Sequence, residues 1–349
     1  MELDLCRNAA ANGLNLTFVA TGGGDLEEEF RNSGIEFIRL QRKLPVDVSL
    51  AFALRKIIKE RDIKVVHGHQ PVEALHLYLA TRGSDIKRIL TLHGIYAGRK
   101  NDLALRFVIP RMDARVTVSK YMLGLASKQG FDTSENFCVI NNGVDPTRLL
   151  SPGRTLRPEL RLAENAMLLG MVANFYADGR KDQLTVCKAL PRVFDRAPHA
   201  QFVFVGSSSG APHLLDECTS FCLQQGIADR VHFLGQRVDI PDVLNSLDVF
   251  VLSSVWEGAP IAVIEAMMMG LATVLSDIAP LREVSGDGVH AILFRTRDAD
   301  DLAAKLIGLV DDPAGRARLG SKARQWATAQ FDIGAHIANL LRLYNSLLV

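Results

Sequence analysis

Short apolar runs alternate with longer amphipathic segments along the first 150 residues. The runs are rich in β-branched residues and predict strands, while the segments between them have the period of helices. The predicted strands are 14–20, 36–40, 64–67, 88–92, 115–118 and 137–140. The predicted helices are 1–12, 25–33, 49–61, 72–82, 103–112 and 120–129. This alternation predicts a parallel sheet with helices on both faces.

A second series of strands follows a segment that has no regular period. Residues 145–158 contain three prolines and are predicted to form a linker. The later strands are predicted at 168–172, 201–205, 231–234, 249–252, 272–275 and 291–294. The fold class is therefore α/β, with two doubly wound, Rossmann-like domains. We assign residues 1–150 to the first domain and residues 151–333 to the second.

The start of the chain departs from the usual order of a doubly wound domain, which is strand, glycine-rich turn and helix. A predicted helix comes first here, so the first strand and its glycine loop are missing. A truncated sequence, a misassigned start codon or a degenerate copy would each give this order. The run Gly22-Gly23-Gly24 does not have the spacing of a phosphate loop, and we expect only a turn there.

The composition is that of a globular protein with a small net charge. It is 48% hydrophobic and 23% charged, with a net charge of +1, and no apolar run reaches the length of a membrane helix. Five scattered cysteines fit reduced thiols and a cytoplasmic location. The modest charge argues against nucleic acid as a partner. Positive charges exceed negative ones in residues 1–150, which leaves room for contact with the inner face of a membrane.

The richest chemical signal is a pair of carboxylates, Glu257 and Glu265, that stand eight positions apart. The strand predicted at 249–252 precedes Glu257, and Pro260 is expected to be the first residue of a helix. Glu257 then lies on the connecting loop, and Glu265 lies about 8 Å along the helix axis. A surface glutamate followed by an unrelated glutamate in a helix would give the same spacing.

The helix start between the two carboxylates is expected to bind an anion. Its backbone belongs to Gly258, Ala259, Pro260 and Ile261. N–H groups at a helix start favour phosphates in the crevice beyond the strand ends, and carboxylates accept hydrogen bonds from hydroxyls. A nucleotide sugar has phosphates between two sets of hydroxyls, so it suits this arrangement.

The string E-G-x-P-x-x-x-x-E-A-M-x-x-G, from Glu257 to Gly270, resembles the E-x7-E signature of retaining glycosyltransferase family 4. The resemblance implies the GT-B fold, in which two Rossmann-like domains face a cleft and a closing helix, here 334–349, packs back on the first domain. It implies metal-independent transfer of a hexosyl unit, with retention, from a UDP- or GDP-linked sugar to a hydroxyl acceptor, and no cofactor. Glu257 would orient the donor sugar and Glu265 the ribose hydroxyls.

Lys181 follows the first strand of the second domain at the mouth of the next helix. A fixed ammonium there could stabilise the charge that develops on a leaving nucleoside diphosphate. The resembled family uses an Arg and a Lys for this purpose, but Asn174 stands where the Arg would fall, and Arg180 is the candidate replacement. A solvated loop with two basic residues would explain the same sequence about as well.

His93 lies in T-L-H-G after a predicted strand and matches a T-x-H-G of the family. The match implies contact with the sugar, through a hydrogen bond or through stabilisation of developing positive charge. An ordinary histidine at a strand end is the alternative. His67 and His69 form an H-x-H whose side chains should point to one side, but the sequence identifies no third ligand, and we predict no metal site.

Three further segments resemble ligand or interdomain contacts of the family. Asn142 lies in N-N-G-V-D at the end of the first domain, and Gly206 begins a loop that could let a nucleotide approach closely. Arg237 and Val238 match the edge that binds the base, where Arg237 could stack. Plain turns explain each segment nearly as well. The D-x-D at 298–300 precedes a predicted helix and is expected to cap it rather than to bind a catalytic metal.

The implied partners are a nucleotide sugar and a glycan or lipid-linked acceptor of cell-envelope polysaccharide synthesis. A peripheral membrane contact through the first domain is also possible, since residues 99–111, with Arg106, Phe107 and Ile109, mix basic and apolar side chains. In its N-terminus the family has a Gly-Gly-x-Glu loop near the acceptor site, and this loop would end at Glu2. One alternative is a non-catalytic or degenerate nucleotide-sugar-binding protein, and another is a nucleotide-sugar epimerase of similar fold.

Overall fold

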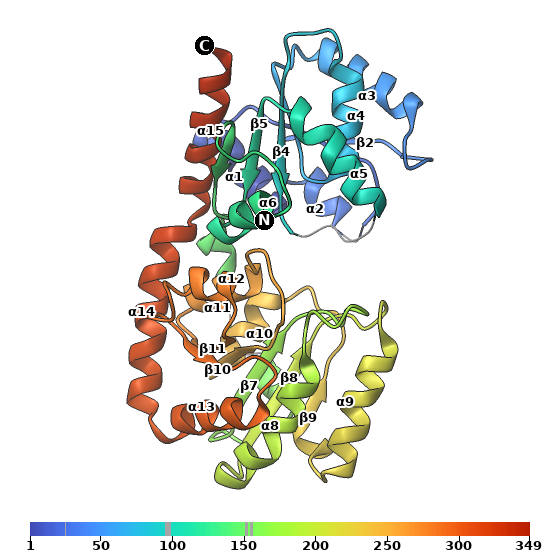
Figure 1. Ribbon diagram of the computed structural model, residues 1–349. Helices are drawn as coiled ribbons and strands as arrows, with labels where there is room; N and C mark the ends of the chain where they lie inside the picture. The colour runs from blue at the N-terminus through green and yellow to red at the C-terminus, as the bar shows by residue number, and fades with distance from the viewer. Residues whose placement is uncertain (25, 95–98, 151–152, 154–155) are drawn as a thin grey trace. The chain divides into compact units, whose positions relative to one another are not determined.

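The computed structural model describes residues 1–24, 26–94, 99–150, 153 and 156–349. The chain divides into two compact units (Figure 1). Unit 1 comprises Met1–Val144 and Phe331–Val349, and unit 2 comprises Asp145–Gln330. The first boundary therefore falls a few residues before residue 150, and the last helix of the chain belongs to unit 1.

Unit 1 contains every strand and helix that the alternation predicted, with small shifts at their ends. Its strands are β1 (Thr17–Ala20), β2 (Glu36–Arg39), β3 (Val65–Gly68), β4 (Lys87–Leu92), β5 (Ala114–Thr117) and β6 (Phe137–Val139). Its helices are α1 (Glu2–Ala9), α2 (Glu27–Arg31), α3 (Val48–Glu60), α4 (Pro71–Thr81), α5 (Arg99–Val108), α6 (Lys120–Lys128) and α15 (Ile333–Leu348).

The strands of unit 1 form two parallel sheets rather than the single sheet expected. β1 pairs with β2, and the second sheet has the order β3-β4-β5-β6. A doubly wound sheet has its first strand near the centre, whereas α1 occupies that place in the order of this chain. Helix α1 packs instead beside α15, where Leu5 and Ala9 share a core with Ile337 and Leu340.

The bounds of the helices follow from capping. Asp47 accepts a hydrogen bond from the backbone N–H of Leu50 at the start of α3, and Ser119 caps α6 in the same way. After α1 a 3₁₀ turn, η1 (Ala10–Asn12), completes the predicted helix, and Gly13 ends it at φ +75°, which favours glycine. Gly13 is therefore the C-cap of this helical segment.

Unit 2 contains one parallel sheet of six strands in the order β12-β11-β10-β7-β8-β9. The strands are β7 (Met167–Val172), β8 (Ala200–Val205), β9 (Val231–Phe233), β10 (Val249–Leu252), β11 (Ala272–Ser276) and β12 (Ile292–Phe294). The helices are α7 (Leu156–Glu159), α8 (Gln183–Arg196), α9 (Pro212–Gln224), α10 (Ile240–Ser246), α11 (Ile261–Met268), α12 (Ala279–Val284), α13 (Ala299–Asp311) and α14 (Pro313–Phe331).

One prediction for unit 2 was incomplete and another is confirmed. The segment expected to be a plain linker carries a 3₁₀ helix, η3 (Pro146–Leu149), and α7. Asp298 accepts a hydrogen bond from the N–H of Asp301 at the start of α13, so the D-x-D is a helix cap as predicted. Within the described ranges, no helix is both long enough and apolar enough to cross a membrane.

Candidate functional site

The strand order of unit 2 reverses between β7 and β10. From β7 the sheet continues to β8 and β9, and from β10 it continues to β11 and β12 in the other direction. Ligands of open α/β sheets bind beyond the carboxyl ends of the strands at such a reversal. The segments that follow β7 and β10 carry Lys181 and Glu257, so this point of the sheet is the candidate site.

Lys181 and Glu257 form an ion pair in which the ammonium donates a hydrogen bond to Oε1 of the carboxylate. Their side chains are only 11% and 9% exposed. Each charge has lost most of its water, and the opposite charge offsets that cost. A phosphate that entered this place would offer the ammonium a second anionic partner.

Backbone hydrogen bonds hold the two loops of this ion pair together. The N–H of Val255 donates to the carbonyl of Arg180 at 2.9 Å, and the N–H of Asp182 donates to the carbonyl of Ser253 at 3.0 Å. The hydroxyl of Ser254 also donates to the Arg180 carbonyl, at 2.7 Å. The pair therefore stands on a fixed scaffold rather than on two independent loops.

The side chain of Arg180 is held by Asp178 and by two aromatic rings. Its guanidinium bonds to Asp178 at 2.6 Å and lies over the rings of Tyr176 and Trp256, at 4.8 and 4.9 Å. The hydrogen bonds that the guanidinium donates to Asp178 raise the pKa of Arg180, so it remains cationic. Its use in place of the missing arginine stays a prediction.

Glu265 lies inside α11 and is paired with a residue that the sequence analysis did not identify. Its carboxylate accepts a hydrogen bond from Arg148 of η3, and only 9% of the Glu265 side chain is exposed. Helix α11 begins at Ile261, so Pro260 is the N-cap residue and not the first helical residue. Proline still suits this position, because it needs no backbone N–H.

The loops after β7 and β8 meet at Gly206. Its φ is +153°, and a Cβ added to it would lie 2.2 Å from the carbonyl oxygen of Ala173. The carboxamide oxygen of Asn174 accepts a hydrogen bond from the N–H of Ser207 at 2.8 Å. Asn174 and Gly206 are thus brought together, and Asn174 orders the loop that was expected to face the nucleotide.

Arg237 and Val238 follow β9 in very different environments. The guanidinium of Arg237 bonds to Asp239 at 2.6 Å and to Glu159 at 2.7 Å, and these bonds raise its pKa. Val238 is 81% exposed. Stacking of Arg237 on a base, which the resemblance implies, stays a prediction and would compete with these two carboxylates.

In unit 1 the turn that contains Asn142 packs against the start of α15. A Cβ on Gly143 would lie 2.6 Å from Cβ of His336, so glycine is required for this close approach. The N–H of Val144 donates to the carbonyl of Phe331 at 2.8 Å. Asn142 itself is buried, and its predicted contact with a ligand is not tested by this packing.

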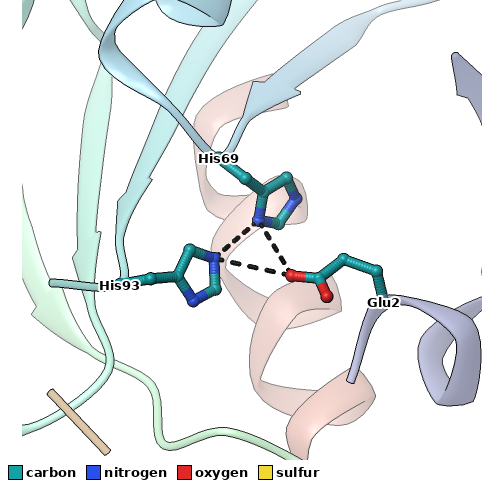
Figure 2. Close-up of side chains that lie close together, drawn as sticks. All are labelled: Glu2, His69 and His93. Carbon is teal, nitrogen blue, oxygen red and sulfur yellow. Dashed lines mark hydrogen bonds and ion pairs between the residues drawn. The ribbon is translucent and has the colours of Figure 1, made fainter. Parts of the chain in front are cut away.

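His93 follows β4 and meets His69, which follows the neighbouring strand β3, and Glu2 at the start of α1 (Figure 2). His93 Nε2 and His69 Nδ1 are 2.9 Å apart. Oε1 of Glu2 lies 3.7 Å from His93 Nε2 and 3.8 Å from His69 Nδ1. Glu2 and His69 were not predicted as partners of His93, although the resemblance of the N-terminus to the end of the family's acceptor loop was a usable signal for Glu2.

His67, the other member of the H-x-H, lies behind this cluster. Its ring stacks on His69 at 4.8 Å, which confirms that both side chains point to one side. Its nitrogens lie 2.7 Å from the Thr91 hydroxyl and 2.8 Å from the Tyr344 hydroxyl. Burial lowers the pKa of His67 well below its usual range and that of His93 to about 4, so both imidazoles are neutral near pH 7.

Two family models together match most of the chain. Residues 3–148 match the model described as Glycosyltransferase Family 4, and residues 166–312 match the model described as Glycosyl transferases group 1. The first match lies in unit 1, except at its end, and the second lies in unit 2.

Two curated relatives have related activities in their names. UDP-Gal:alpha-D-GlcNAc-diphosphoundecaprenol alpha-1,3-galactosyltransferase of Escherichia coli is 25% identical over 281 residues, which cover 76% of this chain and 71% of that protein. N,N'-diacetylbacillosaminyl-diphospho-undecaprenol alpha-1,3-N-acetylgalactosaminyltransferase of Campylobacter jejuni is 35% identical over 146 residues, or 42% of this chain and 37% of that protein.

A solved structure shares the fold over the whole chain. HepE of Anabaena, in complex with UDP and glucose, matches with a TM-score of 0.84 at 20% identity, and the match covers 99% of this chain and 96% of that one.

Proposed function

Because the chain is a glycosyltransferase of the GT-B type that uses nucleotide sugars, we propose that it transfers a hexosyl unit from a UDP- or GDP-linked sugar to a hydroxyl acceptor. The acceptor is a saccharide or a lipid-linked glycan. The names of the two bacterial relatives, which act on undecaprenol-linked acceptors, support this class. The E-x7-E string supports retention of anomeric configuration.

In the proposed reaction the acceptor hydroxyl attacks the anomeric carbon on the face from which the diphosphate leaves. The bond between the sugar and the phosphate oxygen breaks, and the leaving phosphate takes the hydroxyl proton. Lys181 stabilises the charge that grows on the diphosphate, so no metal ion is required. Glu257 orients the donor sugar, Glu265 accepts hydrogen bonds from the ribose, and His93 contacts the sugar.

The observation that carries this proposal is the Lys181–Glu257 ion pair at the reversal of the strand order. Both members are nearly buried and held by each other, so little side-chain ordering is required when a donor binds. When the diphosphate becomes the partner of the ammonium, the Glu257 carboxylate is released to accept hydrogen bonds from sugar hydroxyls.

Turnover of the Lys181→Ala and Glu257→Gln variants tests these roles. We expect kcat to fall about 100-fold or more for each variant, since each loses a group that acts on developing charge or on the orientation of the donor. The assay uses a panel of UDP- and GDP-hexoses chosen by thermal shift, and the product anomer is read by NMR. Arg192→Ala is the matched control, because Arg192 forms an exposed ion pair with Asp300 in the same unit.

Turnover within about twofold of the wild type for both folded variants would show that the assigned roles are wrong. Nucleotide binding without any turnover of the wild-type chain would favour the non-catalytic alternative. An inverted product anomer would overturn retention.

We further propose that unit 1 contacts an anionic membrane surface peripherally. Val48 and Phe52 lie one turn apart on α3 and are 59% and 66% exposed. Leu44 and Val46 extend this apolar surface, and Arg42 and Lys43 beside them are exposed. In the stretch 99–111, Ile109 is buried, and Leu103 and Phe107 are 65% and 41% exposed. The four exposed apolar side chains between residues 44 and 52 form the larger apolar surface, so we take the start of α3 as the better candidate for this contact.

A further inference from the structure

We infer that Glu2, His69 and His93 bind a divalent transition-metal ion of the zinc class, and that the bound ion inhibits glycosyl transfer. The three side chains come from the start of α1 and from the ends of the paired strands β3 and β4. Figure 2 shows that a carboxylate oxygen and two imidazole nitrogens converge on one point. The binding part of the inference is independent of the proposed function, and the inhibition part rests on it.

The three ligand atoms are spaced as zinc requires. They form a triangle with sides of 2.9, 3.7 and 3.8 Å. The circumradius of such a triangle is about 2.0 Å, which agrees with zinc bonds of about 2.0–2.2 Å to nitrogen and oxygen. An ion can therefore sit within bonding distance of all three atoms with little movement of the side chains.

The type and number of ligands select the class of ion. Two imidazoles and one carboxylate favour zinc, cobalt or nickel, whereas magnesium and calcium prefer oxygen ligands. Three protein ligands leave an open coordination position for water or a substrate group. The side chains of His93, His69 and Glu2 are 24%, 26% and 35% exposed, so an ion can enter from solvent.

The surroundings of His69 hold its ring in place before any ion binds. The backbone N–H of His69 donates to a carboxylate oxygen of Glu73 at 3.0 Å, which fixes the start of the loop. The ring of His67 stacks on the other side, and the hydroxyls of Thr91 and Tyr344 fix His67 in turn. Supporting contacts of this kind orient metal ligands and strengthen metal binding.

Inhibition follows from the double use of one side chain. His93 Nε2 is a ligand of the inferred ion, and His93 is also the residue proposed to contact the donor sugar. A bound ion would occupy this nitrogen and place a positive charge next to a sugar on which positive charge develops during transfer. The proposed reaction uses no metal ion, so we infer that zinc bound at this place acts on it as an inhibitor.

Titration of the full, untagged chain with Zn²⁺ and with Co²⁺ tests the binding part. After treatment with a chelator, the wild type should bind one ion by calorimetry, and Co²⁺ should give the visible absorption of a low-coordinate site. His69→Ala and Glu2→Gln should weaken the affinity about 100-fold or more. His199→Ala, which removes an exposed histidine of unit 2, is the control and should bind like the wild type.

The outcomes separate the two parts of the inference. Equal affinity of the wild type and the folded His69→Ala variant, or no binding of Zn²⁺ at 100 times the protein concentration, would overturn the metal site. With the site established, transfer by the wild type should fall as Zn²⁺ fills it and recover when a chelator is added. Binding of Zn²⁺ without inhibition of measurable transfer would overturn the inhibition alone, and a chain without transferase activity would still report its metal affinity.

Discussion

In unit 2 the polar groups beyond β7 and β10 meet as full charges, whereas in unit 1 the groups beyond β3 and β4 are mainly imidazoles. Lys181 and Glu257 neutralise each other in a nearly buried pair. His93 and His67 are kept neutral by burial, and Glu2 is the carboxylate beside them. Both sites use the carboxyl ends of parallel strands.

The difference shows that the same position in two parallel sheets can carry groups of different chemistry, which suit different ligands. A cation held in place suits an anion such as a diphosphate. A group of neutral nitrogens beside a carboxylate suits hydroxyls or a metal ion. The two halves of a nucleotide-sugar reaction, departure of the diphosphate and attack by a hydroxyl, make these two different demands.

The largest loss of stability is expected from a substitution that displaces the backbone beside the candidate site in unit 2. Gly206→Ala would place a Cβ against the carbonyl oxygen of Ala173, which is main chain and cannot move aside. We expect the free energy of unfolding to fall by about 3 kcal/mol, measured by urea denaturation. Gly179→Ala is the control, since Gly179 also has a positive φ but has open space around it, and it should cost about 1 kcal/mol.

A smaller effect is expected when the second carboxylate of unit 2 loses its cation. Arg148→Met leaves the mostly buried Glu265 without its guanidinium partner, and we expect the free energy of unfolding to fall by about 2 kcal/mol. Glu265→Gln in the same chain should restore part of that loss. In unit 1, Glu2→Gln should cost less than about 1 kcal/mol, because Glu2 is more exposed. Equal costs for Arg148→Met and Glu2→Gln would remove the electrostatic contrast between the units.

The smallest effect concerns the surface of unit 1 and leaves stability unchanged. Phe52→Ser should weaken binding to vesicles that contain anionic lipid by about tenfold, because it removes an exposed aromatic side chain from the apolar surface of α3. Vesicle flotation at two salt concentrations measures this. Leu223→Ser in unit 2 removes a side chain that is 64% exposed and should have no effect. A loss of the same size for both variants would contradict a specific surface on unit 1.

The strands and helices could be predicted because burial imposes a period on neighbouring residues. That information is local, so the bounds of β10 and α6 follow from it within a residue or so. Periodicity could not predict how the strands of unit 1 pair. It identifies each strand separately and does not say which strands are neighbours, so the division into the sheets β1-β2 and β3-β4-β5-β6 was not foreseen. The structure of η3 was hidden by its proline, Pro146, which predicts a break as readily as a 3₁₀ turn.

Residues of the candidate site could be predicted only where their motifs resembled parts of the same family site. Lys181 and Glu257 were assigned to one site and lie in contact, although 76 positions separate them. Arg148 stands 117 positions from Glu265, and no periodicity relates the two. Nothing in the sequence near His93 points to Glu2, because α1 reaches the ends of β3 and β4 through the packing of the fold, and the resemblance of the N-terminus to the family's acceptor loop was the signal for it.

The contact between Arg180 and Trp256 has a practical consequence for work in solution. The chain has two tryptophans, and Trp256 lies directly before Glu257 with a guanidinium over its ring. Trp326 stacks instead on His290, and its indole N–H donates to the carbonyl of Val284. Fluorescence from Trp256 is therefore a built-in optical probe of the proposed donor site, and we expect it to change when an unlabelled sugar nucleotide binds there.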